Sequence, residues 1–99
     1  MKKQPTRLGE ALQALLTSTA VGERIEEAAV VPEWAERVGP AIAAVTVPLR
    51  VSRGVLLVGV RSSAWLMELT LMEAEIALRL NEGRARGKIS KIRFQMLSP

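Results

Sequence analysis

Apolar and polar residues alternate with a period of two between Val45 and Val60, which is typical of a β-hairpin. Along the first strand we expect an apolar face made by Val45, Val47, Leu49 and Val51 and a second face made by Thr46, Pro48, Arg50 and Ser52. Arg53 and Gly54 are predicted to form the turn, because glycine adopts a positive φ without a steric penalty. The returning strand then carries its apolar face on Leu56, Val58 and Val60.

Before the hairpin, apolar side chains recur every three or four residues, which predicts helices. A first helix carries the stripe Leu8, Leu12, Leu15 and Leu16, and a second begins near Val21 with Ile25, Ala28 and Val31 buried and continues inward with Trp34 and Val38. Pro32 is expected either to kink this second helix or to restart it from its own first turn. Gly39 is a stop signal, and Pro40 can open a short helical turn through Ala44.

The strongest helical pattern follows the hairpin, where Ser62 and Ser63 are expected to cap a helix. Its predicted buried stripe is Trp65, Leu69, Met72, Ile76 and Leu80, widened by Leu66, Leu71 and Leu78. Asn81 and Gly83 are suited to end it, and residues 83–87 form a basic loop. In the last strand, Ile92, Phe94 and Met96 are expected on one face, and Lys91, Arg93 and Gln95 on the other.

These elements occur in the order helix, helix, strand, strand, helix, strand. The sequence therefore predicts a single α+β domain over residues 1–99, with helices packed on one face of a three-stranded sheet. The length of 99 residues supports one small core, and the apolar runs are too short to cross a bilayer. We expect a cytoplasmic protein that does not contact a membrane, since cysteine and an apolar leader are both absent.

Several motifs occur together between Trp34 and Phe94, in a fixed order. They are Trp34-x4-Gly39, Thr46-x-Pro48, Gly54-Val-Leu-x-Val58-x-Val60, Ser62-Ser-Ala-Trp65, Leu69, Leu80-Asn81 and Ile92-Arg93-Phe94. This order resembles the DciA family of bacterial replicative-helicase operators. The resemblance implies a K-homology-like fold and a protein that binds the DnaB-type replicative helicase and single-stranded DNA to assist helicase loading or activation. It implies no cofactor and no small-molecule substrate.

One feature departs from nucleic-acid-binding K-homology domains, which clamp the backbone with a GXXG loop between two helices. Here the candidate loop runs from Gly83 to Gly87, has three intervening residues and lies between a helix and a strand. Clamping of four nucleotides by such a loop is therefore not expected.

Charge is distributed unevenly along the chain. Residues 1–49 carry a net charge of −1 and residues 50–99 a net charge of +5, although the total is only +4. A clustered positive field attracts phosphates, whereas the same charges could also form an ordinary solvated surface. We expect nucleic-acid contacts from Arg50, Arg53, Arg61, Arg84, Arg86, Lys88, Lys91 and Arg93. Of these, Arg50, Arg61, Lys91 and Arg93 should lie on the outer sheet face, and Arg84, Arg86 and Lys88 along its edge.

The two tryptophans are interpreted mainly as core residues, with Trp65 the more exposed at the start of its helix. Trp65 and Met67 are the candidate partner-binding residues. With Phe94 as the third aromatic residue, a platform that stacks several bases is poorly supported.

An enzyme is not expected, because the chain has no histidine, cysteine, tyrosine or aspartate from which to build a catalytic triad or a mixed metal site. Its ten glutamates sit on patterned helices, where solvated charges are the ordinary explanation, and no phosphate-binding glycine motif is present. The alternatives to a helicase-binding protein are a small K-homology-like RNA-binding or ribosome-associated module and a purely structural interaction domain.

Overall fold

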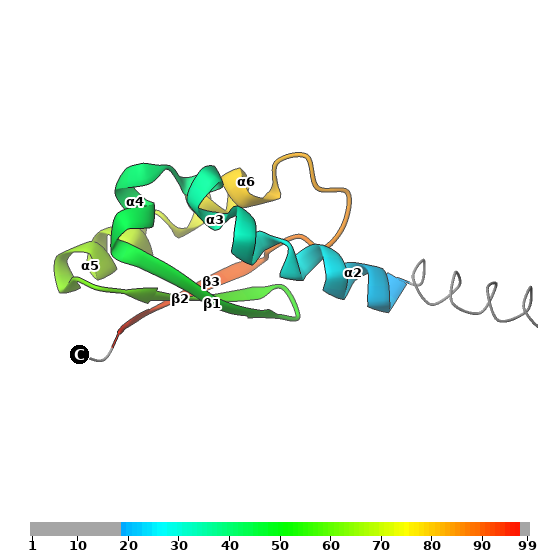
Figure 1. The fold of residues 1–99 in the computed structure, drawn as a ribbon, viewed down its shortest axis with the longest axis horizontal. Helices are drawn as coiled ribbons and strands as arrows, with labels where there is room; N and C mark the ends of the chain where they lie inside the picture. The colour runs from blue at the N-terminus through cyan, green and yellow to red at the C-terminus, as the bar shows by residue number, and fades with distance from the viewer. Residues whose placement is uncertain (1–18, 98–99) are drawn as a thin grey trace, which may run out of the picture.

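The computed structural model describes residues 19–97, and the order of elements within them matches the predicted α+β class (Figure 1). The elements are α2 (Thr19–Ala28), α3 (Val30–Val38), α4 (Pro40–Val45), β1 (Thr46–Ser52), β2 (Val55–Val60), α5 (Ser63–Leu71), α6 (Glu73–Asn81) and β3 (Lys91–Met96). The predicted helix over Leu8 to Leu16 lies outside the described residues.

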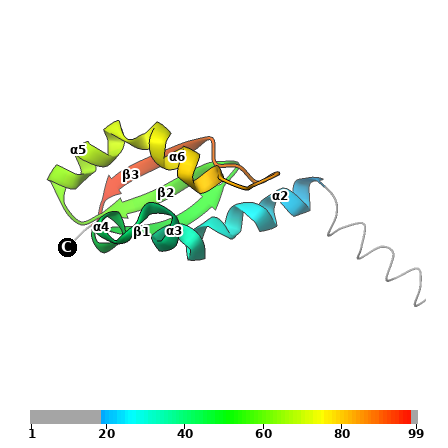
Figure 2. The same cartoon turned by 90° about the horizontal axis from the view of Figure 1, so that it is seen from above.

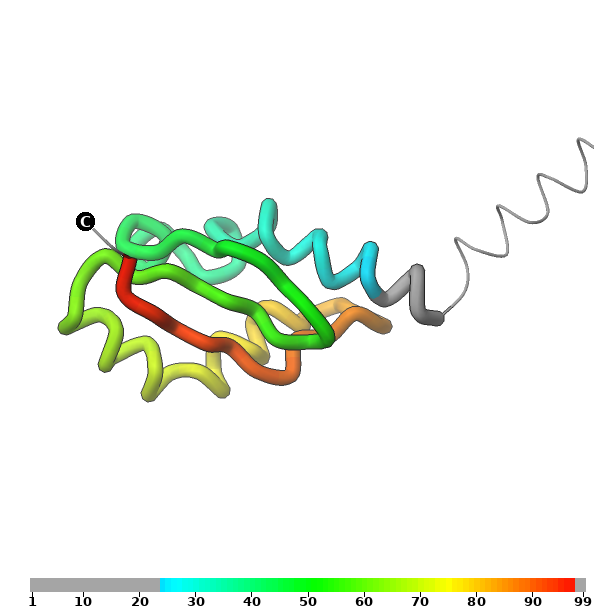
Figure 3. Tube along the Cα trace, turned by 90° about the horizontal axis from the view of Figure 1, so that it is seen from below, coloured from blue at the N-terminus to red at the C-terminus, as the bar shows by residue number. Residues whose placement is uncertain are grey.

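The three strands form one mixed sheet in the order β1-β2-β3. Strand β2 pairs antiparallel with β1 and parallel with β3. Helices α5 and α6 make the crossover between the two parallel strands, and all the described helices lie on one side of the sheet (Figures 1 and 2). The view from below shows the opposite face without any covering helix (Figure 3). This arrangement is compatible with the K-homology-like fold that the resemblance implies.

The core lies between the sheet and the helices. Its buried apolar side chains are Val30, Trp34, Val38, Ile42, Leu56, Val58, Val60, Leu69, Ile76, Leu80, Ile89 and Ile92. Trp34 is the largest of them and is 2% exposed, which confirms that it belongs to the core. Trp65 is half-buried against this cluster, as predicted for the more exposed tryptophan.

Trp34 also ties α3 to the start of the sheet through a hydrogen-bond chain. Its indole N–H donates to Oγ1 of Thr46 at 2.9 Å, and the Thr46 hydroxyl donates to the carbonyl of Ile42 at 2.6 Å. Thr46 is the only residue in the described part of the protein that is both polar and buried as a whole. The two hydrogen bonds therefore give partners to polar atoms that burial would otherwise leave without any.

The prediction that Ile25, Ala28 and Val31 form a buried stripe is wrong, because Ile25 and Ala28 are exposed and Val31 is only half-buried. Pro32 lacks an N–H group, so it cannot donate to the carbonyl of Ala28, and the helix restarts at Val30 with Pro32 in the first turn of α3. Most of α2 then extends beyond the sheet, which leaves it little to pack against (Figure 1). The buried stripe begins at Val30 instead.

The predicted face of strand β1 is also wrong over its first half. The pairing shifts between Pro48 and Arg50, so Leu49 is an extra residue in a β-bulge. Before the bulge, Thr46 and Pro48 pair with the buried Val60 and Val58. The apolar residues that were expected on the buried face of this half therefore do not lie there, and Leu49 itself is 40% exposed. The turn is as predicted, with positive φ at both of its central residues, Arg53 and Gly54.

The single helix predicted after the hairpin is divided at Met72 into α5 and α6. Together they follow the predicted buried stripe, and Ser62 caps α5 by accepting from the N–H of Trp65. The expectation that Leu71 and Leu78 widen this stripe is wrong, because they are 81% and 73% exposed. Each lies two residues from a buried position, which on a helix is a rotation of about 200°. Both therefore face away from the core.

We predict that Trp34→Ala lowers the free energy of unfolding by about 3–5 kcal/mol, because it removes the largest buried side chain and its hydrogen bond. Urea denaturation followed by circular dichroism measures this loss. Met67→Ala is the control, since Met67 is 72% exposed and its truncation should change stability by less than about 0.5 kcal/mol. A stable Trp34→Ala variant would contradict the assignment of Trp34 to the core.

Candidate nucleic-acid interface

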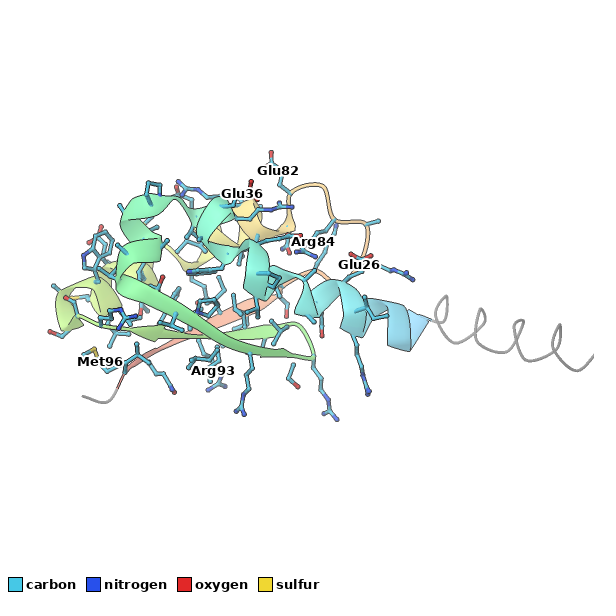
Figure 4. The ribbon with its side chains drawn as sticks, viewed as in Figure 1. Glu26, Glu36, Glu82, Arg84, Arg93 and Met96 are labelled. Atoms are coloured by element: carbon cyan, nitrogen blue, oxygen red, sulfur yellow. The ribbon has the colours of Figure 1, made fainter. Side chains whose placement is uncertain are left out.

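The uncovered sheet face is organised by the strand register. Arg50 on β1, Leu57 on β2 and Arg93 on β3 occupy one row across the sheet, because Leu57 pairs with both arginines. Lys91 pairs with Val55 one step along the same face. Figure 4 shows Arg93 on the side of the sheet opposite the helices. The predicted placement of Arg50, Lys91 and Arg93 on the outer face is therefore confirmed.

This row encloses a shallow depression of about 290 Å³ lined by Arg50, Ser52, Val55, Leu57 and Arg93. Aliphatic side chains form its floor, and an arginine stands on each side. Val55 and Leu57 are half-buried although no helix covers this face. Arginine stems can cover such aliphatic surface while their guanidinium groups stay in water.

The charge of this face has one sign. The three strands contain no acidic residue, and Arg50, Lys91 and Arg93 are exposed. No salt bridge joins any of the three to another described residue. Their charges are therefore available to an anion from outside the described part of the protein.

Of the other predicted cations, some lie next to the sheet face and others lie on the helical side. Arg53 is exposed in the hairpin turn, and Arg61 follows β2 with its backbone N–H bonded to the carbonyl of Val45. Lys88 lies beside the same turn, since its carbonyl is close to Gly54. Arg86 lines a depression on the helical side with Glu26 and Glu33, so its predicted position along the sheet edge is wrong.

The predicted position of Arg84 along the sheet edge is also wrong. Its side chain is only 6% exposed and bonds to other parts of the protein. Its guanidinium donates to the carbonyls of Leu80 at 2.9 Å and Glu26 at 2.7 Å, and to Oε1 of Glu33 at 2.8 Å. It thereby fastens the loop after α6 to helices α2 and α3, as Figure 4 shows for Arg84 and Glu26. Three of the five N–H donors of this guanidinium are therefore occupied, and its 6% exposure leaves it inaccessible to a phosphate.

A second surface lies on the helical side. A groove of about 590 Å³ runs between α3–α4 and α5–α6, lined by Val38, Gly39, Pro40, Ala41, Ile42, Ala64, Trp65, Glu68, Met72 and Arg79. Trp65 contributes to this wall, whereas Met67 is 72% exposed and borders a smaller depression on α5. The residue pattern alone did not indicate the groove, because its walls come from helices more than 20 residues apart in the sequence.

The described residues contain no cluster of side chains able to hold a metal ion. In the same part of the chain, no helix combines the length and the apolar character needed to span a membrane. The side chains that the two surfaces offer are arginine and lysine on the sheet, and mainly apolar side chains with Glu68 and Arg79 in the groove between the helices.

Comparison with known proteins adds a family to this geometry. The model of the family described as "Dna[CI] antecedent, DciA" matches residues 7–94. A UPF0232 protein of Mycobacterium leprae is 26% identical over 92 residues, which are 93% of this chain and 49% of that protein. A UPF0232 protein of Mycolicibacterium smegmatis is 30% identical over 78 residues, 79% of this chain and 40% of that protein. The chain thus spans about half the length of these curated relatives or less.

We predict that Arg84→Ala lowers the free energy of unfolding by about 2 kcal/mol, because it leaves the carbonyls of Leu80 and Glu26 without their donor. Thermal and urea denaturation measure the change. Arg61→Ala, which removes an exposed arginine, should alter stability by less than about 0.5 kcal/mol. Equal unfolding midpoints for the two variants would show that Arg84 does not hold the loop.

Proposed function

The chain belongs to the DciA family, and from that premise we propose that it is an accessory protein of bacterial DNA replication that binds the DnaB-type replicative helicase and single-stranded DNA. It assists the loading or activation of the helicase. It works by binding, with the helicase supplying ATP chemistry. The family name, Dna[CI] antecedent, supports the link to replication, and the two surfaces described above support the two binding activities.

The single observation that carries the DNA-binding proposal is the uncovered sheet face with cations of one sign. Arg50 and Arg93 flank an aliphatic floor, and Lys91 extends the row along β3. Such a surface follows a phosphate backbone by charge, since it presents guanidinium and ammonium donors without aromatic side chains for base stacking. We therefore expect binding that depends strongly on salt and weakly on sequence.

The helicase contact is proposed at Trp65 and Met67. Trp65 combines a half-buried ring with a position on the wall of an apolar groove, and aromatic residues in such positions often anchor protein interfaces. Met67 lies two residues further along α5, about 200° around the helix from Trp65, where it is 72% exposed and lines a separate depression. Both residues belong to α5, which lies on the helical side of the sheet, so one molecule can engage the helicase there and DNA on the cationic face.

Simultaneous binding gives the proposed mechanism its energetic basis. If the helicase and DNA bind the same molecule on different sides, DNA binding can favour helicase binding, and the effect is reciprocal. The rigid sheet and helix layer hold the two surfaces in a fixed relation. The protein would then hold a helicase next to the strand that it is to encircle.

We predict that Arg50→Gln and Arg93→Gln each weaken binding to a single-stranded oligonucleotide and flatten its salt dependence. Each lost phosphate contact should reduce the slope of log K against log salt by about 0.7. Fluorescence anisotropy at several salt concentrations measures both effects. Arg86→Gln removes the same charge from the helical side and should leave the slope unchanged.

Two outcomes of that titration would contradict the sheet-face proposal. One is an unchanged slope in both sheet variants, and the other is an equal loss in Arg86→Gln. Ribo-oligonucleotides of the same sequence provide a further comparison. A preference for RNA of more than about tenfold, equal to about 1.4 kcal/mol, would favour an RNA-binding module instead.

We predict that the purified chain binds the replicative helicase of its own organism and that Met67→Ser weakens this binding by at least about fivefold, or about 1 kcal/mol. Met67 is exposed, so its replacement should not alter the fold. Interferometry at two salt concentrations measures the affinity. Leu49→Ser, another exposed apolar residue but on the sheet, is the matched control. No saturable helicase binding by the folded chain would contradict the proposal.

A further inference from the structure

The depression on the uncovered sheet face is closed at one end and open at the other. Gly59 is the next outward-facing residue of β2 after Leu57, and a Cβ placed on it would collide with the side chain of Leu97. Leu97 therefore lies over β2 on this face and ends the depression there. At the opposite end, Val55 borders the hairpin turn, where Arg53 is exposed. The depression therefore opens toward the turn.

Two arginines stand on opposite sides of the depression, and the space between them has room for a flat ring. Arg50 and Arg93 both pair with Leu57, so their backbones lie two strand spacings apart, about 9.6 Å. A planar ring stacked between two guanidinium planes needs about 7 Å, which is twice the stacking distance of about 3.4 Å. The space itself is the depression of about 290 Å³.

The chemistry of this space favours a nucleobase over a phosphate alone. Its floor is aliphatic, formed by Val55 and Leu57, and a base ring buries apolar surface there whereas a phosphate does not. A guanidinium stacks on a base through its plane, while its N–H donors lie in that plane and stay free for phosphates. No salt bridge joins Arg50 or Arg93 to another described residue, so both planes are accessible.

We propose that the depression binds one unpaired base of a DNA strand, held between the guanidinium planes of Arg50 and Arg93 above Leu57. The adjoining backbone then passes Lys91 and Arg53, which are both exposed. The two arginines take the place that aromatic residues have on other surfaces that bind single strands. The inference deepens the proposed function, and it rests on the proposal that this face binds DNA.

This occupant requires a single strand. In a duplex, neighbouring bases cover both faces of every base, so no ring can enter the depression. A surface that binds by charge alone favours the duplex instead, because the duplex carries its phosphates more densely than a single strand does. We therefore expect the chain to bind a single-stranded oligonucleotide at least about threefold more tightly than the duplex of the same sequence.

Oligothymidylate and an abasic oligomer of the same length test the proposal directly, because they carry the same phosphates and differ only in their bases. Fluorescence anisotropy with the full chain, at several salt concentrations, measures the affinity and the salt slope for each. The wild-type chain should bind oligothymidylate at least about tenfold more tightly than the abasic oligomer. The salt slopes for the two probes should be similar, since the slope counts phosphate contacts.

Two kinds of variant separate the guanidinium planes from their charges. Arg50→Lys with Arg93→Lys keeps both charges and removes both planes, so it should lose most of the preference for oligothymidylate at an unchanged salt slope. Arg93→Tyr keeps a plane and removes a charge, so it should retain the preference and lower the slope by about 0.7. Loss of folding produces neither pattern. Arg86→Lys, on the helical side, is the matched control and should change neither quantity.

The proposal is overturned if oligothymidylate and the abasic oligomer bind equally, or if the duplex binds as tightly as the single strand. It is also overturned if Arg50→Lys with Arg93→Lys keeps the wild-type preference. In these cases a salt-dependent affinity for DNA leaves the proposed function standing and removes only this inference. Absence of binding to every oligonucleotide removes the inference together with the DNA-binding part of the proposed function.

Discussion

The constraint on which the structure depends is that the described helices all lie on the same side of a three-stranded sheet. A chain of this size can build one core, and Trp34 lies within it, hydrogen-bonded to the first residue of β1. The other sheet face is consequently left to solvent. Long cationic side chains suit it, because their stems cover aliphatic positions such as Leu57 while their charges stay hydrated.

This one-sided packing also affects the distribution of charge. The strands carry cations and no acidic residue, whereas the helices and their loops carry glutamates together with arginines, among them Arg37, Arg79 and Arg84, which form ion pairs with them. Within the described residues, the sheet face is thus the one with charge of a single sign. Because they share one core, a molecule that binds on one side presents its other side in a fixed orientation.

The sequence predicted the elements well because their patterns are local, as the hairpin turn at Gly54, the restart at Pro32 and the cap at Ser62 show. It failed where one residue changes the geometry or where distant segments meet. The bulge at Leu49 reverses the alternation without any signal in composition. Leu71 and Leu78 are apolar but exposed, because each lies two residues from a buried position of its helix and therefore on the opposite side.

The arginines show most clearly why composition alone does not locate the candidate site. Arg84 and Arg93 lie nine residues apart, yet the first is buried against α2 and α3 and the second is exposed on the sheet. Arg84 acts on the site indirectly, because it holds the loop that leads to β3. The backbone N–H groups of Ser90 and Lys91 then bond the carbonyl of Gly54, which fixes where the strand begins. The positions of Lys91 and Arg93 on the cationic face therefore depend on an arginine that cannot itself reach a phosphate.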